Sequence, residues 1–292
     1  MAIIETKQLS KFYGTVRGIE NLNLTVNEGD FFGFIGPNGA GKSTTIRTLL
    51  GLISPTAGSA SVLGLDCVKN KNEVLQNVGY LPSETAFYRG MTAAELIEFS
   101  AKLRGIDCRN EAKKLCEILA LDTKRRVSEL SLGNRKKVGI VCALQHKPSL
   151  YILDEPTSGL DPLMQHEIYS LLEQRNREGA TVFLSSHVLS EIARYCQKAA
   201  IIRQGSIIAC DSVKNLASTG LKRVTLWDAN QFVAPDGAMD VRCEQGTVEF
   251  LFEGDANKLL WALNSLSFSD FTVTDPSPDE IFMHYYQKED NT

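Results

Sequence analysis

A glycine-rich segment at residues 36–44 constrains this chain more than any other feature. It reads Gly-Pro-Asn-Gly-Ala-Gly-Lys-Ser-Thr and matches the pattern G-x-x-x-x-G-K-[ST]. A short apolar run at 31–35 precedes it and a helix-like stretch at 43–50 follows it. Glycines let backbone N–H groups turn inward around phosphate oxygens, and the N-terminus of the next helix adds a favourable dipole. Strand, loop and helix in this order predict the start of an α/β domain that binds phosphate.

Two side chains of this loop have expected roles of their own. Lys42 can reach the β- and γ-phosphates of a nucleotide, and the hydroxyl of Ser43 can ligate Mg²⁺. A glycine-rich turn without a ligand is the alternative, and the strand and helix around the loop argue against it. The expected nucleotide-binding residues are Gly36, Pro37, Asn38, Gly39, Ala40, Gly41, Lys42, Ser43 and Thr44.

Polar residues follow two further apolar strands. The run at 150–153 leads into Asp154 and Glu155, at the strand end where open α/β sheets place ligands. Asp154 is suited to hold Mg²⁺, directly or through water, and Glu155 to polarise an attacking water as general base. His187 ends the run at 181–187. A lone histidine after a strand is more often a turn or core residue. His187 therefore becomes a catalytic candidate only if it lies beside the other two strand ends, those of the glycine-rich loop and of Asp154 and Glu155.

Charge and cysteine usage narrow the class of protein. The chain has 31 Lys and Arg against 35 Asp and Glu, a net charge of -4, which argues against a nucleic-acid partner. Its 7 cysteines are scattered without a Cys-x-x-Cys pair, which fits a reducing cytosol and no zinc site. No apolar run approaches the ~20 residues of a membrane span, and the N-terminus reads as a strand. We therefore expect a cytosolic soluble protein, or one that touches a membrane only through a partner.

The patterning along the chain predicts two domains. Residues 1–218 form the first, with an all-helical subdomain inserted at about 88–147; Thr92 is expected to cap its first helix together with Glu95. Residues 219–292 form a small α+β domain in which we find no chemical motif. Its expected elements are strands at 223–227, 247–252 and 271–274 and helices at 256–266 and 278–286.

From residue 1 to about 216 the chain resembles the ATP-binding subunit of ABC transporters. Residues 130–134, Leu-Ser-Leu-Gly-Asn, resemble the signature loop of that family, and residues 154–161, which end in Asp161, resemble its Walker B and D-loop. His187 matches the family's switch histidine. Tyr13 is similar to the aromatic residue that stacks on adenine, although an ordinary strand-end tyrosine is the alternative.

The resemblance implies a fold, an activity and partners. The fold is a P-loop NTPase core, a RecA-like sheet with N-terminal antiparallel strands. The activity is hydrolysis of ATP to ADP and phosphate with Mg²⁺, coupled to transport. Two copies, identical or different, form a head-to-tail dimer in which Ser131, Gly133 and Asn134 of one copy cover the γ-phosphate held by the other. A separate integral-membrane permease places the chain on the cytoplasmic face of the cell membrane. The branch it resembles exports drugs, antibiotics or ions.

Two departures from the family pattern concern the signature and the link to the permease. Leu132 and Asn134 stand where the family has Gly and Gln. Ser83 stands where the family has a glutamine that senses Mg²⁺, and Glu84 is the candidate substitute. By resemblance a permease helix docks near 83–88, where Phe87 and Tyr88 suit a groove but equally suit a core.

Functions of other classes remain as alternatives. A ribosome-associated ATPase usually carries two ATP-binding halves, and one P-loop is present here. A DNA-repair ATPase would have long coiled coils between Ser43 and Asp154, and no heptad run occurs there. A nucleotide sensor that barely hydrolyses would not need Glu155. The sequence therefore favours the subunit of a transporter.

Overall fold

The structure is a computed structural model, and it divides into two compact units, Met1–Val213 and Lys214–Thr292. The boundary predicted at 218/219 lies a few residues further along the chain. The residues that the structure describes are 1–85, 87–88, 90–218, 220–229, 232–264, 266–277, 280, 281, 283 and 285.

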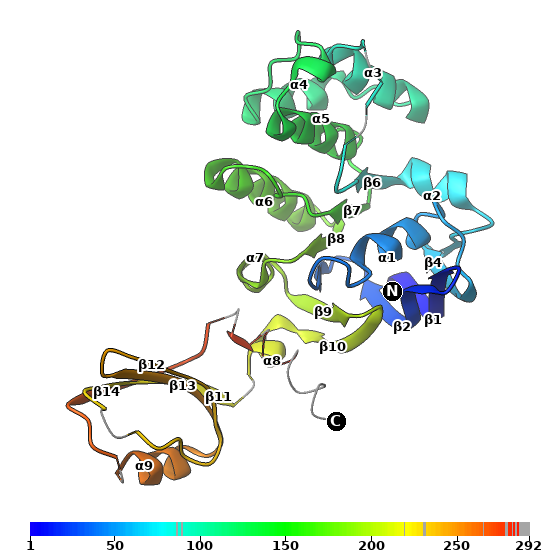
Figure 1. Ribbon diagram of the computed structural model, residues 1–292. Helices are drawn as coiled ribbons and strands as arrows, with labels where there is room; N and C mark the ends of the chain where they lie inside the picture. Colours follow the sequence, from blue (N-terminus) through cyan, green and yellow to red (C-terminus); the bar gives the residue numbers. More distant parts are fainter. Residues whose placement is uncertain are drawn as a thin grey trace. The chain divides into compact units, whose positions relative to one another are not determined.

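A six-stranded sheet forms the centre of the first unit, in the order β10-β9-β3-β8-β7-β6 (Figure 1). The strands from β9 to β6 are parallel and β10 is antiparallel to β9. Every residue of β3, β7 and β8 is buried, which explains their continuous apolar runs in the sequence. The strands are β3 (Phe31–Ile35), β6 (Val78–Leu81), β7 (Leu150–Asp154), β8 (Thr181–Ser186), β9 (Lys198–Arg203) and β10 (Ser206–Ser212).

A second, antiparallel sheet is built mainly from the N-terminal hairpin. Its order is β2-β1-β4-β5. Gly14, with a φ of 62°, closes the hairpin between the two long strands in a left-handed conformation that suits glycine. The sequence predicted a strand at the N-terminus, and the family resemblance implied N-terminal antiparallel strands; neither of the last two strands was predicted. The strands are β1 (Ala2–Tyr13), β2 (Val16–Asn27), β4 (Ala57–Val62) and β5 (Leu65–Asp66).

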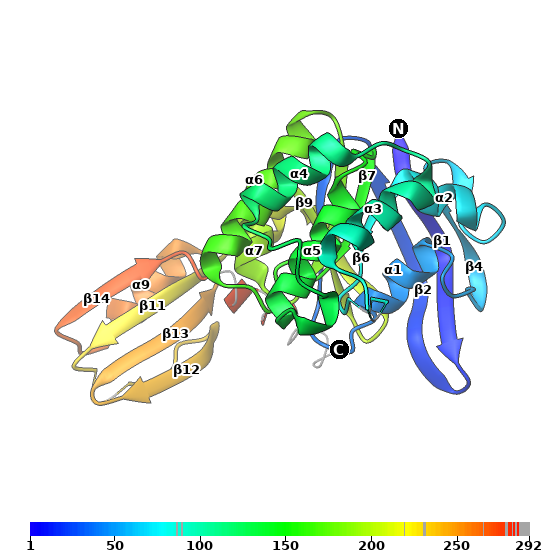
Figure 2. The same cartoon turned by 90° about the horizontal axis from the view of Figure 1, so that it is seen from above.

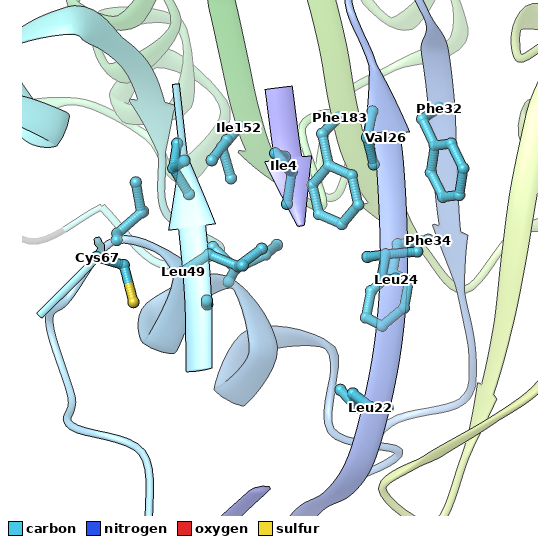
Figure 3. Close-up of a cluster of buried hydrophobic side chains, with 14 of the residues drawn as sticks. Ile4, Leu22, Leu24, Val26, Phe32, Phe34, Leu49, Cys67, Ile152 and Phe183 are labelled. Atoms are coloured by element: carbon cyan, nitrogen blue, oxygen red, sulfur yellow. The ribbon is translucent and has the colours of Figure 1, made fainter. Parts of the chain in front are cut away.

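The main hydrophobic core lies between these sheets and α1 (Lys42–Leu49) (Figure 3). Phe183 is central to it: its ring lies 5.9 Å from that of Phe32 and 5.6 Å from that of Phe34. Burying a phenylalanine stabilises a fold by about 1.5–3 kcal/mol. The core thus fixes β3 and β8 side by side, and both strands end at the candidate site.

Helices complete the first unit. The inserted helical group lies together at one end in Figure 1, and its first helix begins with the capping box expected at Thr92 and Glu95. None of the helices described here is long and apolar enough to cross a membrane. The inserted group is α3 (Ala93–Arg104), α4 (Arg109–Ile118), a 3₁₀ turn (Val127–Glu129) and α5 (Leu132–Leu144); the others are α2 (Lys71–Asn77), α6 (Pro162–Arg177), α7 (Leu189–Tyr195) and α8 (Val213–Ala217).

The second unit is a four-stranded antiparallel sheet with one helix over a face, in the order β12-β13-β11-β14 (Figure 2). The sequence predicted three of these strands and the helix, and it missed β12. Of the closing helix predicted at 278–286, residues 278, 279, 282, 284 and 286 lie outside the described residues. The elements are β11 (Leu221–Trp227), β12 (Ala238–Glu244), β13 (Thr247–Glu253), α9 (Ala256–Asn264) and β14 (Asp270–Thr274).

Candidate active site

The glycine-rich loop joins β3 to α1, as the sequence predicted. Gly41, directly before α1, has a φ of 109°, and a Cβ built on it would lie 2.7 Å from the carbonyl oxygen of Gly18. No L-residue with a side chain fits there without moving the backbone. The glycine therefore sets the path of the loop into the helix N-terminus.

A pocket of about 550 Å³ opens on this loop. It brings together most of the residues that the sequence nominated, including Glu155 and His187 from the ends of two neighbouring strands. Gly36 and Ala40 of the loop do not line it, and neither do the three signature residues. The lining residues are Tyr13, Val16, Arg17, Gly18, Pro37, Asn38, Gly39, Gly41, Lys42, Ser43, Thr44, Ser83, Glu84, Glu155, Ser158 and His187.

The carboxylate of Glu155 lies between a lysine and a histidine. Its Oε1 is 3.1 Å from Nζ of Lys42 and its Oε2 is 2.7 Å from Nδ1 of His187. Because a carboxylate only accepts hydrogen bonds, Nδ1 of His187 carries the proton in this contact. Lys42, 5% exposed, also donates to the carbonyl oxygens of Gly36 at 2.6 Å and Pro37 at 3.2 Å. The ammonium is therefore held where phosphate oxygens would replace these acceptors.

Asp154 is buried beside Glu155 and has a hydroxyl partner of its own. Residues Asp154 and Ser185 are neighbours in the register of β7 and β8, and Oγ of Ser185 donates to Oδ1 of Asp154 at 2.6 Å. Ser43 and Asp154 are hard oxygen donors of the kind Mg²⁺ takes, with Ser43 in the pocket. The described residues contain no group of three or more His, Cys, Asp or Glu that could hold a metal by themselves. A Mg²⁺ ion at this site would thus need phosphate oxygens and water as further ligands.

The segment after β6 brings Ser83 and Glu84 to the pocket wall. A buried lysine on α5 fixes it: Nζ of Lys136 donates to the carbonyl oxygen of Ser83 at 2.9 Å. Burial lowers the pKa of Lys136 to about 8, while the negative charges of Asp154 and Glu155 act in the opposite direction. The helix that starts at the signature is therefore tied to the nucleotide pocket through this backbone contact.

The signature and D-loop residues lie at helix N-termini outside the pocket. Ser131 caps α5 by accepting from the N–H of Asn134, and Asp161 caps α6 by accepting from the N–H of Met164. A Cβ built on Gly133 would lie 3.3 Å from the side chain of Leu160, so the two loops touch. Ser131, Gly133, Asn134 and Asp161 therefore lie on two loops in contact with each other, and none of the four lines the pocket of the chain's own phosphate loop.

Tyr13 lies at the rim of the pocket, 46% exposed, with Nζ of Lys11 at 5.3 Å from its ring centre. An open aromatic face at this point can receive a flat ring by stacking. Val16 and Arg17, across the hairpin turn from it, also line the pocket. No sequence motif indicated these two residues or Gly18, which also lines the pocket; their position shortly after Tyr13 was the available signal.

Three further residues, Ser185, Lys136 and Glu191, carry no sequence motif that indicates their contacts. Ser185 and Lys136 were missed because their contacts depend on strand register and on how α5 packs. Glu191 was missed although it lies only four residues after His187, in the first turn of α7, which begins two residues beyond that histidine. Thr157 of the loop after β7 donates to Glu191 at 2.9 Å.

Comparison with known proteins decides the family. A family model described as ABC transporter matches residues 19–158. The bacitracin transport ATP-binding protein BcrA of Bacillus licheniformis is 44% identical over 212 residues, 70% of this chain and 68% of the relative. The chain belongs to the ABC transporter family. It thus contains the domain with which members of that family bind and hydrolyse ATP, as the P-loop and Glu155 predicted.

Solved structures agree with this assignment. One described as the ATP-binding subunit of an ABC transporter has a TM-score of 0.70 and 30% identity, covering 73% of this chain and 91% of that one. The dimeric cassette MJ0796, in a post-hydrolysis state bound to ADP and Pi, has a TM-score of 0.64 at 24% identity, covering 72% of this chain and 98% of that one. The second likeness shows the fold alone. The predicted P-loop NTPase fold is confirmed.

Proposed function

We propose that this ABC ATPase powers a separate membrane permease that exports a drug or an antibiotic. Two copies close head to tail around ATP and open after hydrolysis. The observation that carries the proposal is an incomplete site. Lys42, Glu155 and His187 meet in one pocket, while Ser131 and Gly133 of the same chain do not line it. A second copy would bring those residues to the γ-phosphate.

The surface around the signature supports closure against a partner. Leu132 is 61% exposed and Leu163, at the start of α6 beside the D-loop, is 68% exposed. Large apolar side chains exposed next to polar loops are typical of interaction surfaces. MJ0796, whose fold this chain shares, has been solved as a dimer. The relative BcrA is described as a bacitracin transport protein, which supports an antibiotic as cargo.

In the closed dimer each residue has a role set by its position. Ser43 and Asp154 would hold Mg²⁺, which supplies charge neutralisation at the phosphates when bound. Glu155 would polarise the attacking water, and His187 would keep the carboxylate oriented through its Nδ1. Lys42 would exchange its loop carbonyls for β- and γ-phosphate oxygens. Asn134 and Asp161 would complete the partner's side, and Tyr13 would receive the adenine.

The segment 83–88 is the proposed docking site of the permease, with Ser83 or Glu84 in place of the family's glutamine. Tyr88 is exposed and packs edge-on against Phe99 of α3, with the ring centres 5.9 Å apart. Phe87 is half-buried, and Ala86 lies outside the described residues. Contact here would place the chain on the cytoplasmic face of the cell membrane. Residues 219–292 would form an accessory domain.

The mass of the Glu155→Gln protein in solution, with and without Mg-ATP, tests the closure. We expect a monomer without nucleotide and a dimer with it, because ATP would join the two surfaces while the variant cannot hydrolyse it. Ser131→Arg in the same background is the matched control and should remain monomeric, since the long cation would occupy the space of the γ-phosphate. A dimer in both proteins, or in neither, contradicts the proposed interface.

Cell fractionation tests the transport assignment separately. The subunit of a transporter should sediment with membranes and be released by detergent. A ribosome-associated ATPase would sediment with ribosomes instead, and a DNA-associated one would be released by nuclease. Substitution of Tyr88 by Glu should release the transporter subunit from membranes without changing its ATP affinity.

A further inference from the structure

The carboxylate of Glu191 accepts hydrogen bonds from three hydroxyl groups, which lie in three different parts of the first unit. Thr157 Oγ1 donates to its Oε1 at 2.9 Å. Tyr169 OH and Ser186 Oγ both donate to its Oε2, each at 2.9 Å. Thr157, Tyr169 and Ser186 are all buried. A length of 2.9 Å lies in the ordinary range for O–H···O hydrogen bonds, and a buried setting strengthens bonds to a carboxylate relative to the same bonds in water.

The segments joined by Glu191 are those that carry the reacting groups. Glu191 lies in the first turn of α7, after His187. Thr157 lies in the loop after β7, two residues beyond Glu155. Ser186 is the last residue of β8 and directly precedes His187. One oxygen of the carboxylate therefore holds the loop of Glu155, and the other holds the backbone next to His187.

Two of the three hydroxyls, those of Ser186 and Tyr169, are oriented for this contact. The N–H of Val188 donates to Oγ of Ser186 at 2.9 Å, which leaves the Ser186 proton for Glu191; the carbonyl of Val188 is further away, at 3.4 Å. Burial, together with the negative charge of Glu191, raises the pKa of Tyr169, so its hydroxyl stays a donor. The carboxylate accordingly acts as a fixed acceptor for three protons.

We propose that Glu191 is a positioning residue for ATP hydrolysis, because its carboxylate clamps the loop of Glu155 to the strand end of His187. The clamp keeps the Glu155–His187 contact at 2.7 Å. This inference rests on the proposed roles of Glu155 and His187. Glu191 itself does not line the nucleotide pocket. Its loss should therefore reduce the turnover number and spare the affinity for ATP.

Glu191→Gln is the direct test. Glutamine keeps the size of the side chain but has one acceptor oxygen, so one side of the clamp opens. A displacement near 1 Å at reacting groups costs about a hundredfold in rate, so we expect kcat to fall by about ten- to a hundredfold. KM and the dissociation constant for ATP should change by less than about twofold. Glu28→Gln, an exposed glutamate on a turn, is the matched control and should keep the wild-type kcat.

Thr157→Val separates positioning from general stability. Valine matches the shape of threonine and removes only the hydroxyl that Glu191 holds. In the wild-type background this change should lower kcat; in the Glu191→Gln background it should lower kcat little further, because the clamp is already open. Ser186→Ala, tested in the same two backgrounds, should show the same pattern of kcat values. These single-hydroxyl variants carry the test if Glu191→Gln does not fold.

Two results would overturn the proposal. One is an unchanged kcat of Glu191→Gln, measured well below its unfolding temperature, even if that temperature falls. The other is an equal cost of Thr157→Val with and without Glu191. Glu155→Gln, measured in the same experiment, separates the role of Glu191 from the proposed role of Glu155. If Glu155→Gln hydrolyses ATP normally, the proposed role of Glu155 is wrong, whatever the Glu191 variants show.

Discussion

His187 Nδ1 lies 2.7 Å from Oε2 of Glu155, and the two residues stand at the ends of neighbouring parallel strands. The contact orients a carboxylate whose other oxygen is 3.1 Å from Nζ of Lys42. Three segments that are far apart in the sequence thus meet at one group. The proposed chemistry of the site depends on that group.

Glu155→Gln should abolish turnover and keep ATP binding. The amide cannot accept a proton from water, and loss of a general base typically costs 10²–10⁴-fold in rate. Lys42 and the loop that would hold the phosphates are unchanged. Phosphate release and fluorescent-nucleotide binding measure the two effects. Hydrolysis at the wild-type rate would remove Glu155 from its role.

Gly41→Ala should lose nucleotide binding. The new Cβ would lie 2.7 Å from the carbonyl oxygen of Gly18, which lines the pocket. Gly179→Ala is the matched control, because its φ of 100° is just as unfavourable for alanine while a Cβ there meets nothing within 4 Å. Both variants should lose about 1 kcal/mol or more of stability. Titration with ATP should show a defect in Gly41→Ala alone.

Acid should destabilise the fold through His146. Burial, helped by the positive charge of Arg104, lowers the pKa of His146 to about 4. The unfolded chain, with an ordinary histidine pKa near 6.5, binds more protons between these values, so the free energy of unfolding falls as pH drops from about 6.5 to 4. The full effect is about 3 kcal/mol.

Urea unfolding of His146→Gln across this pH range checks the assignment. The variant should lose that part of the pH dependence, and His166→Gln, a substitution at an exposed histidine, should retain it. An unchanged slope in His146→Gln would show that other groups cause the acid sensitivity.

Deletion of residues 222–292 should spare ATP binding. The residues that line the nucleotide pocket all belong to the first unit, as does its main hydrophobic core. Calorimetric titration of the truncated protein with ATP measures this. Loss of binding in a truncated protein that stays folded would mean that the second unit completes the site.

Local sequence patterns predicted the parts of the fold that a single segment determines. The phosphate loop, the buried strands before Asp154 and His187, and the capped start of α3 each depend on adjacent residues. The β4–β5 pair and β12 were missed because their residues are only partly buried, which leaves a weak apolar pattern. For β4 the partner β1 also lies far away in the sequence. The contact of Asp154 with Ser185 needs the strand order β8-β7, which no local pattern contains.

The backbone of Glu155 has a φ of 50°, in the left-handed region that a residue with a side chain adopts at a cost of about 1–2 kcal/mol. Asparagine and glycine tolerate this conformation better. Replacing Glu155 by either should thus raise the melting temperature of a protein that no longer turns over. Selecting variants for thermostability alone would therefore favour replacement of Glu155 and loss of ATP hydrolysis. ATPase activity has to be measured in the same screen.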